Sequence, residues 1–171
     1  TSGLLVVAKH DRAHEGLAEQ FKDHSIQRRY AAITGGIPVP RHGTIDTWIG
    51  RSDNNRVKMA VQREGRGKRA ITHYAVREQL RGAALVECRL ETGRTHQVRV
   101  HMAHIGNALI GDPVYGRPKK GFKTILDMLM FNRQALHAEL LGFTHPVTGE
   151  NLKFESAVPQ DMQELLIQLR V

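Results

Sequence analysis

The chain has 171 residues, of which 40% are hydrophobic, and its 25 Lys and Arg outnumber its 17 Asp and Glu to give a net charge of +8. This length suits one domain with a sizeable core, and the absence of any apolar run of about 18 residues excludes a membrane-spanning helix. A compact domain with this much positive charge favours a polyanionic partner, most often nucleic acid. A generally basic protein without such a partner is the alternative.

Cys88 is the only cysteine, so the sequence excludes an internal disulfide and a paired-cysteine zinc site. A reducing, cytoplasmic setting fits this usage. Because Cys88 lies in an alternating stretch, packing is favoured over a role as a nucleophile. The opening residues TSGLLVVAKHD lack a basic leader and a cleavage site, so we do not expect a signal peptide there.

The first half of the chain is expected to form strands with one helix inserted among them. Apolar runs and period-two alternation predict the strands, and turns rich in Gly, Asn or Pro separate them. Asp11 is expected to cap the helix, with Leu17, Ala18 and Phe21 on its apolar side. In chain order we expect a buried strand at 4–9, the helix to about 23, and strands at 29–34, 44–49, 57–61, 70–78 and 84–91, with a turn near Gly82.

The second half adds three helices and a hairpin. Thr95 is expected to cap a helix that runs to about Ile105, with Gly106 just past its end. The remaining elements are a short helix at 125–130, strands at 135–143 and 152–157, and a final helix opened by Pro159 that carries Met162, Leu165, Leu166 and Leu169 on one face. Strands joined by short turns, with helices between groups, predict an α+β fold on a mixed, largely antiparallel sheet with flanking helices.

The segment ETGRTHQVRVHMAHIG, residues 91–106, combines many cations with an apolar stripe. On a helix, Val98, Met102 and Ile105 share one face, and that face is expected to join the core. Arg99 flanks the stripe, and a buried unpaired charge is heavily penalised. We therefore infer that Arg99 has a carboxylate partner. Gln97, His101 and His104 are expected to face away from the stripe.

The start of this helix is a candidate anion site. Unpaired N–H groups and the positive end of the helix dipole favour a phosphate beside Arg94 and Thr95. A surface turn solvated by Arg94 is an equally open interpretation. His101 and His104 have a spacing that permits joint metal ligation, but no HExxH motif or nearby cysteine supports it. Satisfied or solvated histidines are favoured, and no metal is predicted.

The stretch LETGRTHQVRVHMAHIGNALIGDPVYG resembles the signature of the RluA/RluD-type pseudouridine synthases. TSGLLVVAK resembles the tail of that family's first motif, HRLDxxTSGLLVVAK, and Arg29-Tyr30-Ala31-Ala32 resembles the second. FNRQALHA and PQDM are more similar to the RluD branch, which acts on large-subunit ribosomal RNA. The resemblance implies a pseudouridine synthase fold with a central RNA-binding cleft, and a single catalytic domain over residues 1–171.

The activity that the resemblance implies is the isomerisation of a uridine in RNA to pseudouridine, without cofactor or metal. The base is flipped from its stack, detached from C1′, turned, and rejoined through C5. The position of Tyr30 stacks on the flipped base and helps the proton leave C5, whereas the position of Arg99 pairs with the catalytic aspartate. Without the resemblance, Tyr30 would be interpreted as a packed strand tyrosine.

The catalytic aspartate of the family motif lies three residues before the threonine that is Thr1 here. Residues 1–171 by themselves are therefore expected to be inactive, and the S4-type RNA-binding domain that RluD-like proteins carry upstream also lies outside them. Asp112, in IGDPVYG, is interpreted as shaping a turn before Pro113 rather than as a catalyst. The other aspartates do not stand in the motif either; they are Asp11, Asp23, Asp46, Asp53, Asp127 and Asp161.

RNA is the expected partner of a monomeric protein with no membrane association. The residues expected to bind it are Arg94, Thr95, His96, Gln97, Arg56 and Lys58. The basic loops at 51–58 and 63–69 are alternatively just solvated charge, and Lys119, Lys120 and Lys123 belong to the same class. A non-catalytic RNA-binding or ribosome-assembly module is the rival function, and a metal hydrolase that uses the histidines is a third hypothesis.

Overall fold

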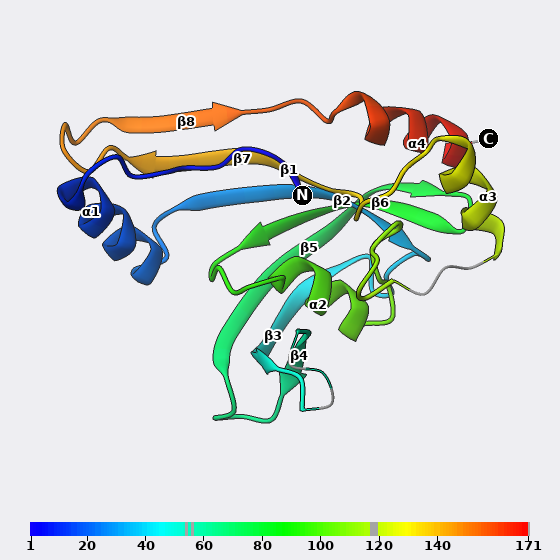
Figure 1. Ribbon diagram of the computed structural model, residues 1–171, viewed down its shortest axis with the longest axis horizontal. Helices are drawn as coiled ribbons and strands as arrows, with labels where there is room; N and C mark the ends of the chain where they lie inside the picture. Colours follow the sequence, from blue (N-terminus) through cyan, green and yellow to red (C-terminus); the bar gives the residue numbers. More distant parts are fainter. Residues whose placement is uncertain (54, 56, 117–119, 171) are drawn as a thin grey trace.

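Alternating apolar residues produce eight strands that pair into a single sheet in the computed structural model, which describes residues 1–53, 55, 57–116 and 120–170 (Figure 1). The strands are β1 (Ser2–Gly3), β2 (Gln27–Gly35), β3 (His42–Arg51), β4 (Met59–Gln62), β5 (Lys68–Leu80), β6 (Ala83–Leu90), β7 (Leu136–Thr144) and β8 (Asn151–Glu155). The helices are α1 (Asp11–Lys22), α2 (Gln97–His104), α3 (Lys120–Met128) and α4 (Gln160–Arg170).

The strand order is β1-β7-β2-β6-β5-β3-β4, and β8 also pairs with β7. β1 is parallel to β7, whereas every other pairing in the described sheet is antiparallel. The hairpin between β5 and β6 turns at Gly82, whose φ of 65° suits glycine. The prediction of an α+β fold with a mixed, largely antiparallel sheet is confirmed.

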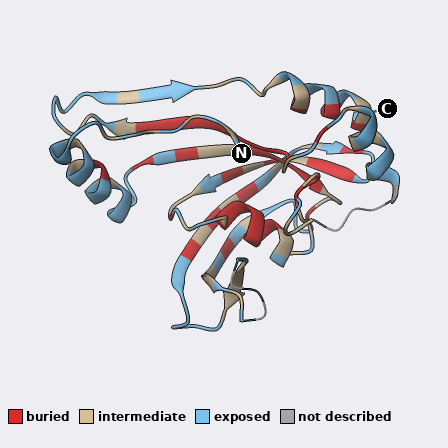
Figure 2. Cartoon of the chain, viewed as in Figure 1, coloured by how far each residue is buried: buried red, intermediate tan, exposed pale blue. Residues whose placement is uncertain are grey.

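Helices cover both faces of the sheet. Ala32 and Ile33 are neighbours in β2, so their side chains point to opposite faces. Ala32 belongs to the apolar cluster that contains Met102 of α2, and Ile33 to the cluster that contains Met162 of α4. Figure 2 shows the buried residues concentrated in the central strands, in α2 and on the inner side of α4. The predicted apolar face of α4 is confirmed.

The expectation of a buried strand at 4–9 is wrong. Only Ser2 and Gly3 pair with β7, and after Leu4, whose N–H donates to the Ala138 carbonyl, the chain leaves the sheet. Leu5 and Val7 are 83% and 73% exposed, and within the described ranges this stretch pairs with no strand beyond Gly3. An apolar run alone does not supply the neighbour that burial requires.

Two expected helix caps also differ. His10 caps α1, since its ring accepts the Ala13 N–H at 3.2 Å, and Ala18 is exposed rather than on the packed side. α2 begins at Gln97 instead of after Thr95, because His96 adopts a left-handed conformation with φ of 58°. None of the helices in the described ranges is both long and apolar enough to cross a membrane.

Candidate active site

A cavity of about 410 Å³ lies between the first residues of the chain and the start of α2. Tyr30 enters it from β2, Leu90 from β6, and Arg94, His96 and Arg99 from the turn and helix that follow β6. Segment 1–5 closes another side. Leu136 and Ala138 of β7 complete the lining, so four segments that are far apart in the sequence meet around one space. Both predicted catalytic residues, Tyr30 and Arg99, line it.

Arg99 is buried and is held by Asp112. Its Nε and Nη2 atoms each donate to one oxygen of that carboxylate at 2.8 Å, and the Asp112 side chain is 0% exposed. The inference that Arg99 has a carboxylate partner is confirmed. Asp112 is a partner within the chain. The pairing of Arg99 with an aspartate before Thr1, which the family resemblance implies, stays a prediction.

Asp112 also shapes the turn that follows it, as predicted. Its Oδ1 accepts the N–H groups of Val114 and Tyr115 at 2.9 and 3.0 Å. Burial alone raises the pKa of the Asp112 carboxyl, but the hydrogen bonds from Arg99, Tyr115 and Val114 together keep that pKa below its usual value. The same pairing raises the pKa of Arg99. Both groups are therefore charged at neutral pH.

Tyr115 joins this ion pair to the β3–β4 hairpin. The Arg99 guanidinium stacks over its ring at 5.0 Å from the centroid. Its hydroxyl accepts the Met59 N–H at 2.9 Å and lies 3.0 Å from Nδ1 of His96. Since the hydroxyl accepts from Met59, its own proton is available to His96, whose pKa is lowered by burial and then by the Arg99 charge. Sequence reasoning missed Tyr115, because nothing local to it indicates these partners.

Tyr30 faces the cavity from a distorted part of β2. The pairing of β2 with β7 shifts register between Arg29 and Tyr30, whereas the pairing with β6 continues unbroken, with Tyr30 opposite Cys88. Burial raises the pKa of the Tyr30 phenol, and the charge of Arg28 lowers it by less. Tyr30 is therefore a neutral phenol at physiological pH.

The residues predicted to bind RNA divide into three groups. Arg94 and His96 line the cavity, and Arg94 donates from Nε to the Arg69 carbonyl at 2.8 Å. Thr95 is exposed beside them, and Lys58 is half-buried with its ammonium on the Val114 carbonyl at 2.9 Å. Arg56 lies outside the described residues, as does Lys119 in the second basic stretch.

Gln97 also lines the cavity, but its amide is engaged within the chain, and its predicted contact with RNA stays a prediction. Gln97 is 2% exposed, and its side-chain oxygen accepts both the Thr92 hydroxyl and the Arg94 N–H. Its nitrogen donates to the Ile71 carbonyl and the Thr72 hydroxyl, each at 3.0 Å. All four hydrogen-bonding positions of the amide are used inside the chain, so Gln97 fixes the 92–97 turn against β5.

His101 is likewise buried instead of facing away from the core. Its ring nitrogens lie 2.8 Å from the Thr72 hydroxyl and 2.9 Å from the Thr47 hydroxyl, and it is 0% exposed. Burial lowers its pKa to about 4. The interpretation of a satisfied histidine is confirmed for His101, and His104 is exposed to solvent.

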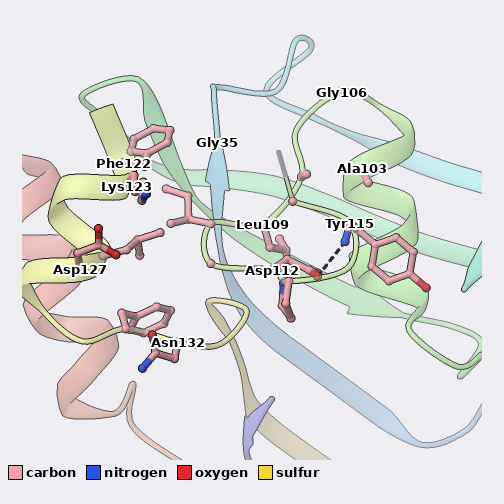
Figure 3. Close-up of a pocket in the computed structure, with 17 residues that line it drawn as sticks. Gly35, Ala103, Gly106, Leu109, Asp112, Tyr115, Phe122, Lys123, Asp127 and Asn132 are labelled. Carbon is pink, nitrogen blue, oxygen red and sulfur yellow. Dashed lines mark hydrogen bonds between the residues drawn. The ribbon is translucent and has the colours of Figure 1, made fainter. Parts of the chain in front are cut away.

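A second, larger cavity of about 810 Å³ lies between the end of α2, loop 106–116 and α3 (Figure 3). Figure 3 shows Phe122 and Asp127 on the α3 side and Ala103 and Tyr115 on the opposite side. Asp112 is at its boundary, but neither Tyr30 nor Arg99 lines it. We therefore place the candidate active site in the smaller cavity, which holds both.

Comparisons with known proteins agree with this geometry. The family model described as RNA pseudouridylate synthase matches residues 1–104. Ribosomal large subunit pseudouridine synthase D of Zymomonas mobilis is 58% identical over 100% of this chain and 54% of its own length, and the uncharacterized RNA pseudouridine synthase YlyB of Bacillus subtilis is 51% identical over 99% and 53%. The chain thus spans about half the length of these curated relatives.

A solved human structure, RNA Pseudouridylate Synthase Domain Containing 4, superposes with a TM-score of 0.72 at 27% identity, over 92% of this chain and 67% of that one. A second solved human structure, RNA Pseudouridylate Synthase Domain Containing 1, has a TM-score of 0.70 at 24% identity and so supports the fold alone. With more than half of the residues matched by the family model, and with Tyr30 and Arg99 in one cavity, the chain belongs to the RNA pseudouridylate synthase family.

Proposed function

We propose that the whole protein converts a specific uridine of RNA, in large-subunit ribosomal RNA, to pseudouridine. The observation that carries the proposal is the meeting of Tyr30 and Arg99 in one cavity of about 410 Å³. Among the described residues that line this cavity, none is acidic, whereas Arg94 and Arg99 are cationic. Such a site suits a flipped base attached to an anionic backbone. The names of the curated relatives support ribosomal RNA as the substrate.

The reaction breaks the bond between N1 and C1′ and forms a bond between C5 and C1′, after which the proton on C5 must leave. Because burial raises the pKa of Tyr30, this residue acts as a neutral phenol rather than as a phenolate base. Its ring offers a stacking face to the flipped uracil. Its hydroxyl accepts the C5 proton while its own O–H proton passes to water, and N1, released from C1′, takes up a proton from water.

Arg99 has capacity for a second carboxylate. Asp112 engages Nε and Nη2, and within the described part of the chain Nη1 donates no hydrogen bond. Thr1 lines the same cavity. We propose that the catalytic aspartate comes from the segment before Thr1, is paired there by Arg99, and that residues 1–171 alone are inactive.

RNA binding is assigned to the basic residues around this cavity. Arg94 and His96 line it, Thr95 between them is exposed, and Lys58 lies at the hairpin that Tyr115 joins to the site. Phosphate contacts of this kind position the backbone, whereas the pocket selects the unstacked base. The assignment of residues 1–171 as one catalytic domain, the monomeric state and the cytoplasmic location stay predictions.

The test uses the whole protein, with all residues that flank 1–171, and ribosomal RNA labelled with tritium at C5 of uridine. We expect release of the label by the wild type, and loss of release in Arg99→Ala and Tyr30→Phe. Arg170→Ala and Tyr74→Phe are matched controls, because Arg170 pairs with Glu78 at the surface and the Tyr74 hydroxyl bonds to Pro40 outside the cavity. RNA binding without any release of label would support the non-catalytic alternative instead.

A further inference from the structure

We propose that Arg28 and Arg94 form an anion site over Gly93 that holds a backbone phosphate of the RNA beside the flipped nucleotide. Arg28 lies two residues before Tyr30 in β2, and Arg94 lines the cavity that contains Tyr30. The identity of the anion as an RNA phosphate rests on the proposed function, whereas the site itself rests on the burial and charge of Arg28.

Arg28 is a buried cation without an acidic partner in the described part of the chain. It is 8% exposed, and its Nε atom is fully buried with no hydrogen-bond partner. Its guanidinium stacks over the Phe21 ring at 5.3 Å and donates from Nη2 to the Glu91 carbonyl at 2.8 Å. A neutral carbonyl does not neutralise a buried charge, so this arrangement costs free energy unless an anion compensates it.

Apart from Arg94, the other partly or fully buried arginines of the described chain have carboxylates. Arg99 has Asp112, Arg77 has both Glu87 and Glu139, and Arg29, adjacent to Arg28, lies 3.4 Å from Glu139. The sequence therefore supplies acids to neighbouring arginines and leaves Arg28 without one. This difference indicates that the compensating anion is a ligand.

A second arginine, Arg94, directly follows Gly93, the position that lies over the Arg28 guanidinium. Arg94 donates to the Arg69 carbonyl and has no carboxylate within 4 Å among the described residues. Burial lowers the pKa of Arg28, and the Arg94 charge lowers it further against an opposing contribution from Tyr30. α2 begins three residues after Arg94 and adds the positive end of its dipole. Two guanidinium groups beside Gly93 suit a phosphate diester, whose oxygens accept paired N–H donors.

Gly93 gives the anion access to Arg28. A Cβ atom at residue 93 would lie 2.3 Å from Nη1 of Arg28, which is closer than any real contact, and Gly93 is exposed to solvent. The φ of Gly93 lies outside the left-handed region, so its backbone does not require glycine. The requirement is for space: the guanidinium lies directly under an exposed position that has no side chain to cover it.

This geometry provides a variant that displaces Arg28 without changing the net charge. We would measure the affinity of the whole protein for a single-stranded, uridine-containing RNA oligonucleotide as a function of salt concentration. Arg28→Gln is expected to reduce the slope of log affinity against log salt by about 0.7, the value for one phosphate contact on a single strand. Gly93→Ala is expected to reduce affinity and slope in the same direction, and Arg28→Lys to retain the slope.

Gly121→Ala is the control for Gly93→Ala, because no atom lies within 4 Å of a Cβ at residue 121, and Arg170→Gln is the control for Arg28→Gln. Wild-type slopes in both Arg28→Gln and Gly93→Ala would overturn the proposal. Arg28 would then have only a structural role, through its hydrogen bond to the Glu91 carbonyl. Release of tritium is measured on the same proteins. If the variants reduce the slope but the protein never releases tritium, the proposed isomerisation is overturned and the phosphate site stands. If tritium is released normally and the slopes are unchanged, the isomerisation stands and the phosphate site is overturned.

Discussion

Arg99 on α2 and Asp112 in the following loop form two parallel hydrogen bonds of 2.8 Å in a buried setting. Because Asp112 is itself held by the N–H groups of Val114 and Tyr115, the carboxylate cannot turn to follow a moving arginine. The pair therefore fixes the Arg99 guanidinium in one orientation toward the cavity, with Nη1 left for a further partner. A group that must orient a reacting carboxylate gains from such a rigid support.

Asp112→Asn is expected to lower the free energy of unfolding by about 3–5 kcal/mol, because it leaves the buried Arg99 charge without a counter-ion. Urea unfolding followed by circular dichroism measures the change. Asp46→Asn is the matched control, since Asp46 makes an equally bidentate pair with Arg69 that is exposed. A surface pair contributes little. Equal effects of the two substitutions would show that burial does not set the importance of the Arg99 pair.

The sequence predicted that Arg99 needs an acid, because a helix from 95 to 105 places it beside the apolar stripe of Val98 and Met102. It did not identify Asp112, since only the folded loop 106–116 brings that carboxylate back to α2. Most strands were predicted from alternation, but strand order depends on contacts between distant segments. β1 and β7 pair across more than a hundred residues, which no local pattern encodes.

The polar side of α2 illustrates a second limit. Helical spacing separates Gln97 and His101 from the apolar stripe, and a polar face on a helix usually faces water. Here that face packs against Thr72 of β5, whose hydroxyl bonds to both residues. Arg28 gave no sequence signal at all, because a basic residue in a strand is ordinarily exposed. Its burial arises from Phe21 above it and the turn at Gly93.

Two substitutions of Tyr115 are expected to affect RNA binding and catalytic turnover differently. Tyr115→Phe removes the acceptor for the Met59 N–H and the partner of His96 but keeps the ring under Arg99, so we expect weaker RNA binding with turnover retained. Tyr115→Leu also removes the ring, so we expect single-turnover tritium release at saturating RNA to fall about tenfold, corresponding to roughly 1.4 kcal/mol of cation–π interaction. Identical turnover in the two variants would contradict this division, and Tyr74→Phe is the control.

Cys88 is expected to be inert in the folded protein. It is 0% exposed, and burial raises the pKa of its thiol to about 12, so the reactive thiolate is scarce at pH 8. We expect iodoacetamide to label Cys88 only after unfolding in urea, as measured by intact mass. Labelling of the native protein at the rate of the unfolded protein would revive the alternative of a nucleophilic cysteine.

His101 is expected to make the free energy of unfolding depend on pH over a range in which Asp112 adds no such dependence. Its folded pKa of about 4 lies below the unfolded value of about 6.5, so the unfolded state binds more protons between these values. Its contribution is therefore complete above pH 6.5 and is lost as the pH falls toward 4, by about 3 kcal/mol in total. Asp112, whose pKa is also lowered, contributes its own loss only below its usual pKa of about 4.

Urea unfolding of the protein at pH 7, 6 and 5 tests this expectation. His101→Gln should flatten the dependence in this interval, because glutamine keeps a donor and an acceptor for Thr47 and Thr72 but does not titrate. His104→Gln is the control, since His104 is on the same helix and exposed. If the free energy of unfolding of His101→Gln depended on pH between 7 and 5 as it does in the wild type, a group other than His101 would take up the protons on unfolding.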